Sequence, residues 1–163
     1  MKIYLSTILL ILLPLFTQAE QLEIELTIPS LDVDPYHRPY IALWLETTDR
    51  QGIQTFAIWY EKDDWLKDMR QWWRKLGRRN PENYDAVTAA TRKPGKYKIR
   101  WDTVDHQGNP IPEGKYYLCI EAAREAGGRD FLRQKIILGN STPQIYSLNG
   151  DIELGTINIT IHP

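Results

Sequence analysis

The sequence contains a single cysteine, Cys119, so no disulfide can form within the chain. It also lacks an excess of charge of one sign, because 20 Lys and Arg residues stand against 21 Asp and Glu residues. A chain with a formal net charge of −1 has no basic field that would attract nucleic acid or an anionic membrane. Cys119 lies in the apolar run KYYLCIEA, which favours a small core residue over a nucleophile.

The sequence also lacks the spacings that bind metals. His37, His106 and His162 are far apart, and none has a second ligand at a helical or turn spacing. The polar loop 102–109 contains Asp and Asn but not the ligand and Gly spacing of a calcium loop, so its residues are interpreted as turn residues. No metal site is predicted.

The first nineteen residues have the features of a secretory signal peptide. Lys2 precedes an apolar run over residues 8–16, and small or polar residues follow up to Ala19, which predicts cleavage before Glu20. The run is shorter than the roughly 20 apolar residues that a spanning helix needs; an uncleaved N-terminal anchor is the alternative. No second hydrophobic span follows, so we expect an exported chain with no stable membrane insertion after cleavage, and residues 20–163 fit a single domain.

Short runs of β-branched and aromatic residues dominate the rest of the chain, and Gly, Pro, Asn and Asp separate them. Most of the runs alternate between apolar and polar residues, and turn residues recur about every ten positions, as in an antiparallel sandwich. The sequence therefore predicts an all-β fold, an Ig-like antiparallel β-sandwich, with strands at 22–28, 39–46, 53–60, 97–101, 115–122, 131–138 and 156–161.

One segment, residues 64–77, breaks the period of two. Its apolar residues recur at spacings of four, three and four, which predicts one amphipathic helix inserted in the sandwich, with Asp63 or Asp64 as its cap and Gly77 at its end. Trp73 lies off this face, so we expect it to face a cleft or a ligand. The residues expected to pack against the sheet are Trp65, Met69, Trp72 and Leu76.

The long connection before residue 97 contains DAVTAAT, residues 85–91. Here Asp85, Thr88 and Thr91 surround small alanines, in a chain that is otherwise rich in bulky aromatics. A long loop in a compact domain is usually functional or disordered. An ordinary polar turn, with Thr and Asp as caps, is the alternative interpretation.

Two stretches resemble known families. The run from Trp101 to Glu125, WDTVDHQGNPIPEGKYYLCIEAARE, is similar to the hairpin of the Ig-like domain in flagellar hook-capping proteins. The order of RPYIALWLE, the aromatic helix, DAVTAATRKPGKY, EAAREAGGRDF and ELGTINITI resembles the predicted periplasmic family named domain of unknown function 2271. This second resemblance covers nearly the whole chain after residue 19 and implies a fold more than an activity.

The segment 85–91 also resembles the acceptor sequence that bacterial flavin transferases modify, although Ala89 stands where Gly is usual. The resemblance implies that Thr91 accepts FMN through a phosphoester bond. Asp85 would hold the loop or bind the metal of the transferase, Thr88 would donate to a phosphate oxygen, and Ala90 with Ala89 would leave space on an exposed loop. Arg92, with Arg78 or Arg79, would pair with the phosphodiester, and Trp72, Trp73 or Trp59 would stack on the isoalloxazine.

These observations predict an exported periplasmic electron carrier with covalent FMN. Its expected partners are an exported flavin transferase and a membrane redox protein. A structural or interaction module that binds a membrane or periplasmic partner is the alternative. A hydrolase is the least favoured, because the sequence offers no pair of nucleophile and base.

Overall fold

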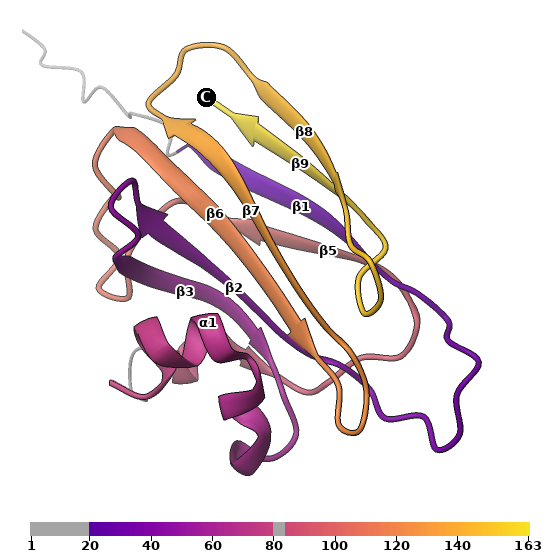
Figure 1. The fold of residues 1–163 in the computed structure, drawn as a ribbon. Helices are drawn as coiled ribbons and strands as arrows, with labels where there is room; N and C mark the ends of the chain where they lie inside the picture. The colour runs from indigo at the N-terminus through magenta and orange to yellow at the C-terminus, as the bar shows by residue number, and fades with distance from the viewer. Residues whose placement is uncertain (1–19, 80–83) are drawn as a thin grey trace, which may run out of the picture.

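The structure, a computed structural model, describes residues 20–79 and 84–163. The segment 1–19, on which the predicted signal peptide falls, lies outside the described residues. The described chain forms two packed sheets, which confirms the predicted all-β sandwich (Figure 1). The nine strands are β1 (Gln21–Ile28), β2 (Tyr40–Thr47), β3 (Gly52–Trp59), β4 (Thr88–Ala89), β5 (Gly95–Trp101), β6 (Gly114–Ala123), β7 (Arg129–Leu138), β8 (Gln144–Asn149) and β9 (Thr156–His162).

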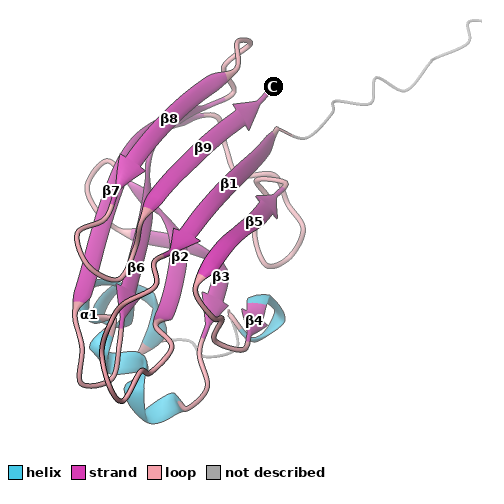
Figure 2. Cartoon of the chain, turned by 90° about the vertical axis from the view of Figure 1, so that its right-hand side faces the viewer, coloured by secondary structure: helices cyan, strands magenta, loops and turns pink. Residues whose placement is uncertain are grey.

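The first sheet has the strand order β5-β1-β9-β8, and the second has the order β4-β3-β2-β6-β7. Every pairing is antiparallel except that between β3 and β4, which is parallel and two residues long. Figure 2 shows the two sheets face to face and β4 beside β3. The helical turns pack on the outer face of the second sheet. Apolar side chains from both inner faces form the main core.

Strand β2 explains how the second sheet supports two cores. Successive side chains of a strand point to opposite faces, so Ile41, Leu43 and Leu45 enter the core between the sheets. Ala42 and Trp44 face the other way and contact the helical segment. Six consecutive residues of β2 are therefore buried, which accounts for its nearly continuous apolar sequence.

The helical segment is not the single amphipathic α-helix that the spacing predicts. It consists of a 3₁₀-helix (Asp63–Asp68), the short helix α1 (Arg70–Trp72) and a π-helical turn (Trp73–Gly77). A 3₁₀-helix repeats every three residues, and the buried side chains follow that spacing at Leu66, Met69 and Trp72. Leu76 is half-buried and packs against the same core, as predicted. Trp65 is half-buried and is not among the residues that pack there, so the predicted face is wrong at Trp65.

The helical segment ends at Gly77 as predicted, but its start differs from the prediction. Neither Asp63 nor Asp64 caps the first turn with its side chain; Lys62 occupies the N-cap position. Instead, a buried carboxylate from the sheet accepts backbone hydrogen bonds at the start of α1. Glu121 of β6 accepts hydrogen bonds from the backbone N–H groups of Gln71 (3.1 Å) and Trp72 (2.8 Å), and Arg129 pairs with it. The first turn of α1 is thus attached to the sheet through a charged group.

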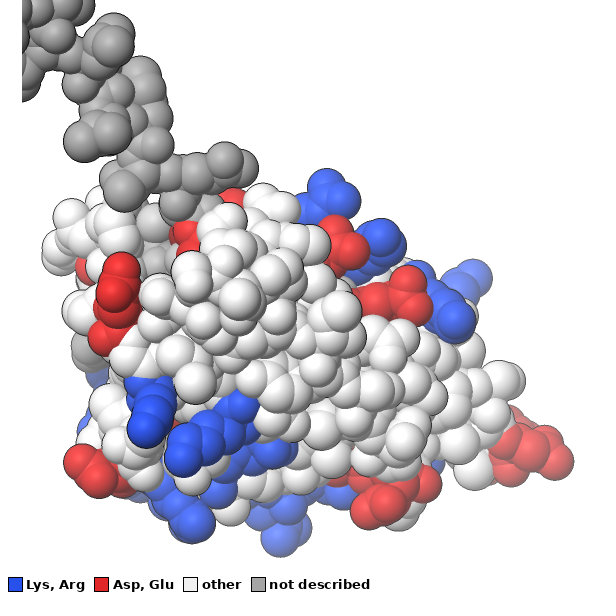
Figure 3. All heavy atoms as spheres, turned by 90° about the horizontal axis from the view of Figure 1, so that it is seen from above, with Lys and Arg blue, Asp and Glu red and all other residues white. Residues whose placement is uncertain are grey.

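Charges of both signs lie around the end of the sandwich seen in Figure 3, among many uncharged residues. In that view neither sign dominates, consistent with the near-zero net charge. No helix in the described part of the chain is long and apolar enough to cross a bilayer.

Candidate functional site

The segment that resembles a flavin acceptor lies at the edge of the second sheet. Residues 85–87 form one 3₁₀ turn, and Thr88 and Ala89 form β4. Thr88 pairs with Ile58 and Ala89 with Trp59, and the Tyr60 N–H donates to the carbonyl of Ala89 at 3.0 Å. The side chains of Asp85, Thr88 and Ala90 are exposed, so these predicted site residues lie together on the surface.

Thr91 itself is buried, with an exposed fraction of 6%. The expectation that the acceptor residue lies on an exposed loop is therefore wrong for this conformation. The chain passes here from β4, at the edge of the second sheet, to β5, at the edge of the first sheet.

Arg92 follows Thr91 and lies over two aromatic rings. Its guanidinium carbon is 4.2 Å from the ring centroid of Trp59 and 5.0 Å from that of Tyr97. Both distances are within the roughly 6 Å of a cation–π contact. The positive charge next to Thr91 is therefore fixed in place by two rings rather than free to swing into solvent.

Of the three tryptophans predicted to stack on a ligand, Trp59 is buried, with an exposed fraction of 3%. The other two have different environments. Trp72 is fully buried, donates from Nε1 to the Thr55 hydroxyl at 3.0 Å, and packs edge-on against Tyr84. A side chain without exposed surface has no face for a ligand, so Trp72 is a core residue and its predicted stacking role is wrong. Trp73 is half-buried and keeps an exposed part.

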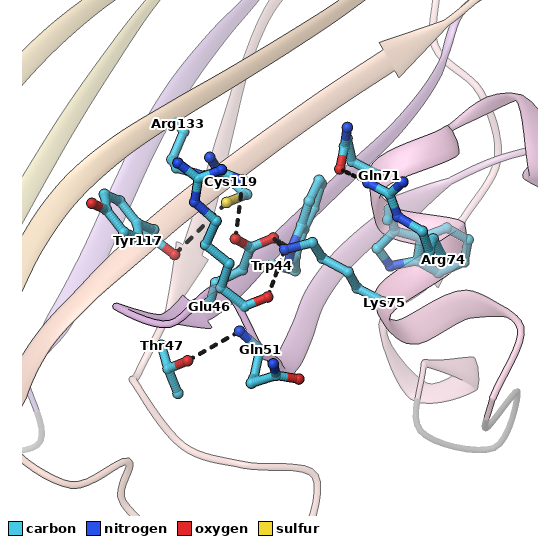
Figure 4. Close-up of polar contacts among 12 residues, drawn as sticks. Trp44, Glu46, Thr47, Gln51, Gln71, Arg74, Lys75, Tyr117, Cys119 and Arg133 are labelled. Atoms are coloured by element: carbon cyan, nitrogen blue, oxygen red, sulfur yellow. Dashed lines mark hydrogen bonds and ion pairs between the residues drawn. The ribbon is translucent and has the colours of Figure 1, made fainter.

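A second group of polar residues, which the sequence analysis did not identify, surrounds Glu46 of β2. Its carboxylate is fully buried and accepts from Lys75 Nζ at 2.9 Å, Arg133 at 3.2 Å and Trp44 Nε1 at 2.9 Å (Figure 4). Lys75 also donates to the carbonyl of Arg50 at 2.6 Å. The Glu46 cluster, meaning Glu46 with Lys75 and Arg133, thus connects the π-helical turn to two strands of the sheet.

Cys119 lies beside this cluster, and its side chain is fully buried as expected. Burial is the main cause that raises the pKa of the thiol to about 12, and the negative charge of Glu46 raises it further. The thiolate is the nucleophilic form of cysteine. Cys119 is therefore inert at neutral pH, in agreement with its interpretation as a small core residue.

A cavity of about 210 Å³ lies between the first half of β3 and the last turn of the helical segment. The Glu46 cluster contributes Lys75 to its wall, and Arg79 lines it from the end of the helical turn. The complete lining is Gly52, Ile53, Gln54, Thr55, Lys75, Leu76, Arg79 and Tyr84. Of the arginines predicted near a cofactor, Arg79 lines this cavity and Arg78 does not, and both residues are exposed.

Fold and site together define a β-sandwich with a helical layer on one face and a cavity between that layer and β3. The chain belongs to the family described as predicted periplasmic protein, domain of unknown function 2271, which matches residues 21–156. No curated protein and no solved structure matches the chain. The resemblance to the Ig-like hook-capping domain therefore stays a prediction, while the family and the sandwich architecture are established.

Proposed function

We propose that this protein carries FMN covalently on Thr91 and serves as an electron carrier in the periplasm. The observation that carries the proposal is the surface formed by the acceptor-like sequence. Asp85, Thr88 and Ala90 are all exposed on one short edge segment that ends at Thr91. A transferase can read these residues on the folded domain, and the small side chains leave room for an approaching active site.

Attachment would join the Thr91 hydroxyl oxygen to the FMN phosphate and break the pyrophosphate bond of a flavin dinucleotide supplied by the transferase, with a nucleoside monophosphate as the leaving group. This step requires the Thr91 hydroxyl at the surface, whereas Thr91 has an exposed fraction of only 6%. The segment that leads to Thr91 is weakly held, because β4 is two residues long and pairs with a single neighbour. Each backbone hydrogen bond contributes about 0.5–1.5 kcal/mol, so detaching so short an edge costs far less than global unfolding. We therefore propose that β4 leaves β3 before Thr91 is modified.

Once bound, FMN would supply the redox chemistry, and the protein would supply attachment and electrostatics. Arg92 is the residue of this chain best placed for the second role. Its guanidinium adjoins Thr91 in sequence and is held by Trp59 and Tyr97. A fixed cation at the attachment point offsets the charge that the phosphodiester retains.

The test is intact-mass measurement of the chain produced with an active exported flavin transferase. We expect one FMN per chain on the wild type and none on Thr91→Ala. Peptide mapping after trypsin then locates the flavin between Arg79 and Arg92, and fragmentation separates Thr91 from Thr88. Because Thr91 is buried, its replacement by alanine could unfold the domain. A thermal melt of Thr91→Ala that matches that of the wild type shows that the missing flavin in the mass measurement is due to the missing hydroxyl. An unmodified wild type, or a Thr91→Ala variant that still carries flavin, would contradict the proposal.

The burial of Thr91 and the exposed edge of the sandwich favour a second candidate, a non-catalytic module that binds a periplasmic or membrane partner. Ile137 on β7 and Ile145 on β8 are exposed by 40% and 76%, on the edge strands of the two sheets. Exposed apolar residues on edge strands are typical of surfaces that pair with another chain. A wild type that stays unmodified beside an active transferase would leave this candidate as the better one.

A further inference from the structure

Three of the four edges of the two sheets carry features that prevent pairing with another strand. An edge presents unpaired backbone N–H and C=O groups, and charged residues, prolines, bulges, coverage or a very short strand protect it. Strand β5 exposes Lys96, Lys98 and Arg100, and β4 is only two residues long. On β7, the Gln144 side chain bonds the backbone N–H and C=O of Ile137, at 3.1 Å and 2.6 Å. These three edges are therefore poor sites for a further strand.

Strand β8 forms the fourth edge and has none of these features. Its sequence, QIYSLN, contains no charged residue and no proline. Its pairing with β9 keeps one register over all six residues, so it has no bulge. In the described part of the chain, no strand pairs with its other side. Ile145 is 76% exposed, more than any other large hydrophobic residue described. This edge is thus a template for one more strand.

The charges of the first sheet lie on the half that is distant from β8. On its outer face the carboxylates of β1 pair with the cations of β5, as Glu23 does with Lys98 and Arg100. His162, the last residue of β9, is the only residue of β8 and β9 that can be charged near neutral pH. The two strands next to the open edge therefore form a nearly neutral surface, which suits a neighbour that is neutral as well.

We propose that β8 pairs antiparallel with β8 of a second copy of this chain, about a two-fold axis, and so joins the two four-stranded sheets into one. Such an interface is isologous and closes at the dimer. The nearest strands with charge on the outer face are then β1 of each copy, five strand spacings or about 24 Å apart. This separation is more than twice the Debye length of about 10 Å at 0.1 M salt, so the like charges of the two copies do not oppose the pairing.

The dimer leaves the segment around Thr91 uncovered. Thr91 lies between β4 and β5, which stand at the other ends of the two strand orders from β7 and β8. Figure 2 shows β5 and β8 at opposite edges of the first sheet. The inference goes beyond both proposed functions, since it requires neither FMN on Thr91 nor a different partner protein. The mass measurement of flavin on Thr91 therefore does not decide it.

The test is the molar mass of the purified chain, produced without a transferase, by sedimentation equilibrium from about 1 μM to about 1 mM. We expect a reversible equilibrium of monomer and dimer with a micromolar dissociation constant, as for a small interface. Ile145→Lys brings two like charges into the short interface and should raise the constant about tenfold or more. The matched control is Val33→Lys, which adds the same charge at a residue 42% exposed outside both sheets and should change the constant less than about twofold.

A crosslink locates the interface and remains informative if Ile145→Lys fails to fold. Ser147 is exposed near the middle of β8, so a short bismaleimide should join two copies of Ser147→Cys into a covalent dimer. It should not join Val33→Cys, and the native Cys119 is buried and does not interfere. A chain that stays monomeric at every concentration overturns the inference. Equal effects of the two lysine variants, or equal crosslinking of the two cysteine variants, overturn it as well.

Discussion

Replacing Trp72 by alanine removes the largest side chain that joins the helical layer to the sheet. Trp72 is fully buried, its indole N–H bonds the Thr55 hydroxyl, and its ring packs on Tyr84 at a centroid distance of 5.1 Å. Truncation of a buried aromatic residue costs about 3–5 kcal/mol. Within that sum the hydrogen bond contributes about 1 kcal/mol and the aromatic pair about 0.5–1.5 kcal/mol.

Two further variants separate these contributions in urea unfolding followed by tryptophan fluorescence and far-UV circular dichroism. Trp72→Phe keeps an aromatic ring but loses the N–H donor, so we expect a loss of about 1–3 kcal/mol, since the Thr55 hydroxyl loses its partner. Trp73→Ala removes a half-buried neighbour and should cost less than Trp72→Ala. Equal losses for Trp72→Ala and Trp73→Ala would refute the assignment of Trp72 to a core.

Two other predictions concern single buried groups. The pKa of Cys119 rises from 9.0 in the unfolded reference to about 12 in the folded chain, so the unfolded chain loses that proton first and stability falls as the pH rises from about 9 to about 12. The free energy of unfolding should fall by up to about 1.4 kcal/mol per pH unit in this range. Urea midpoints of the wild type and of Cys119→Ala at pH 8 and pH 10 measure this decrease. Parallel changes in the two proteins would refute the prediction. Asp130 accepts the backbone N–H groups of residues 151–154, so Asp130→Asn should lower stability by about 1.5–3 kcal/mol, the contribution of a bond to a charged group. An unchanged urea midpoint of that variant would show that the loop holds without the charge.

The sequence was sufficient for most of the fold because turn residues separate short runs of β-branched and aromatic residues, and some strands, such as β1 and β9, bury alternate residues. Every predicted strand is present, most with bounds within two residues of those observed. The sequence analysis did not identify β8 and β4. Strand β8 alternates only between half-buried and exposed residues, so its apolar pattern is weak, and two residues of β4 are too few for any period.

The helical segment and the site were less predictable, since both depend on contacts between distant parts of the chain. Spacings of four and three favour an α-helix, but the residues buried in the core shared with the sheet, Leu66, Met69 and Trp72, recur every three positions. The Glu46 cluster joins residues 87 positions apart. Its one signal in the sequence was an acidic residue, Glu46, in an otherwise apolar strand, and Glu121 in β6 gives the same signal.

The second sheet separates two cores, one shared with the first sheet and one shared with the helical layer. The sandwich core is complete without the helical layer, whereas the helical layer has nothing to pack on without the sheet. Unfolding can therefore start with the outer layer while the sandwich persists, in two cooperative units of different stability. The cavity and β4 both adjoin the outer layer, so any activity located there would be lost on heating before the sandwich melts.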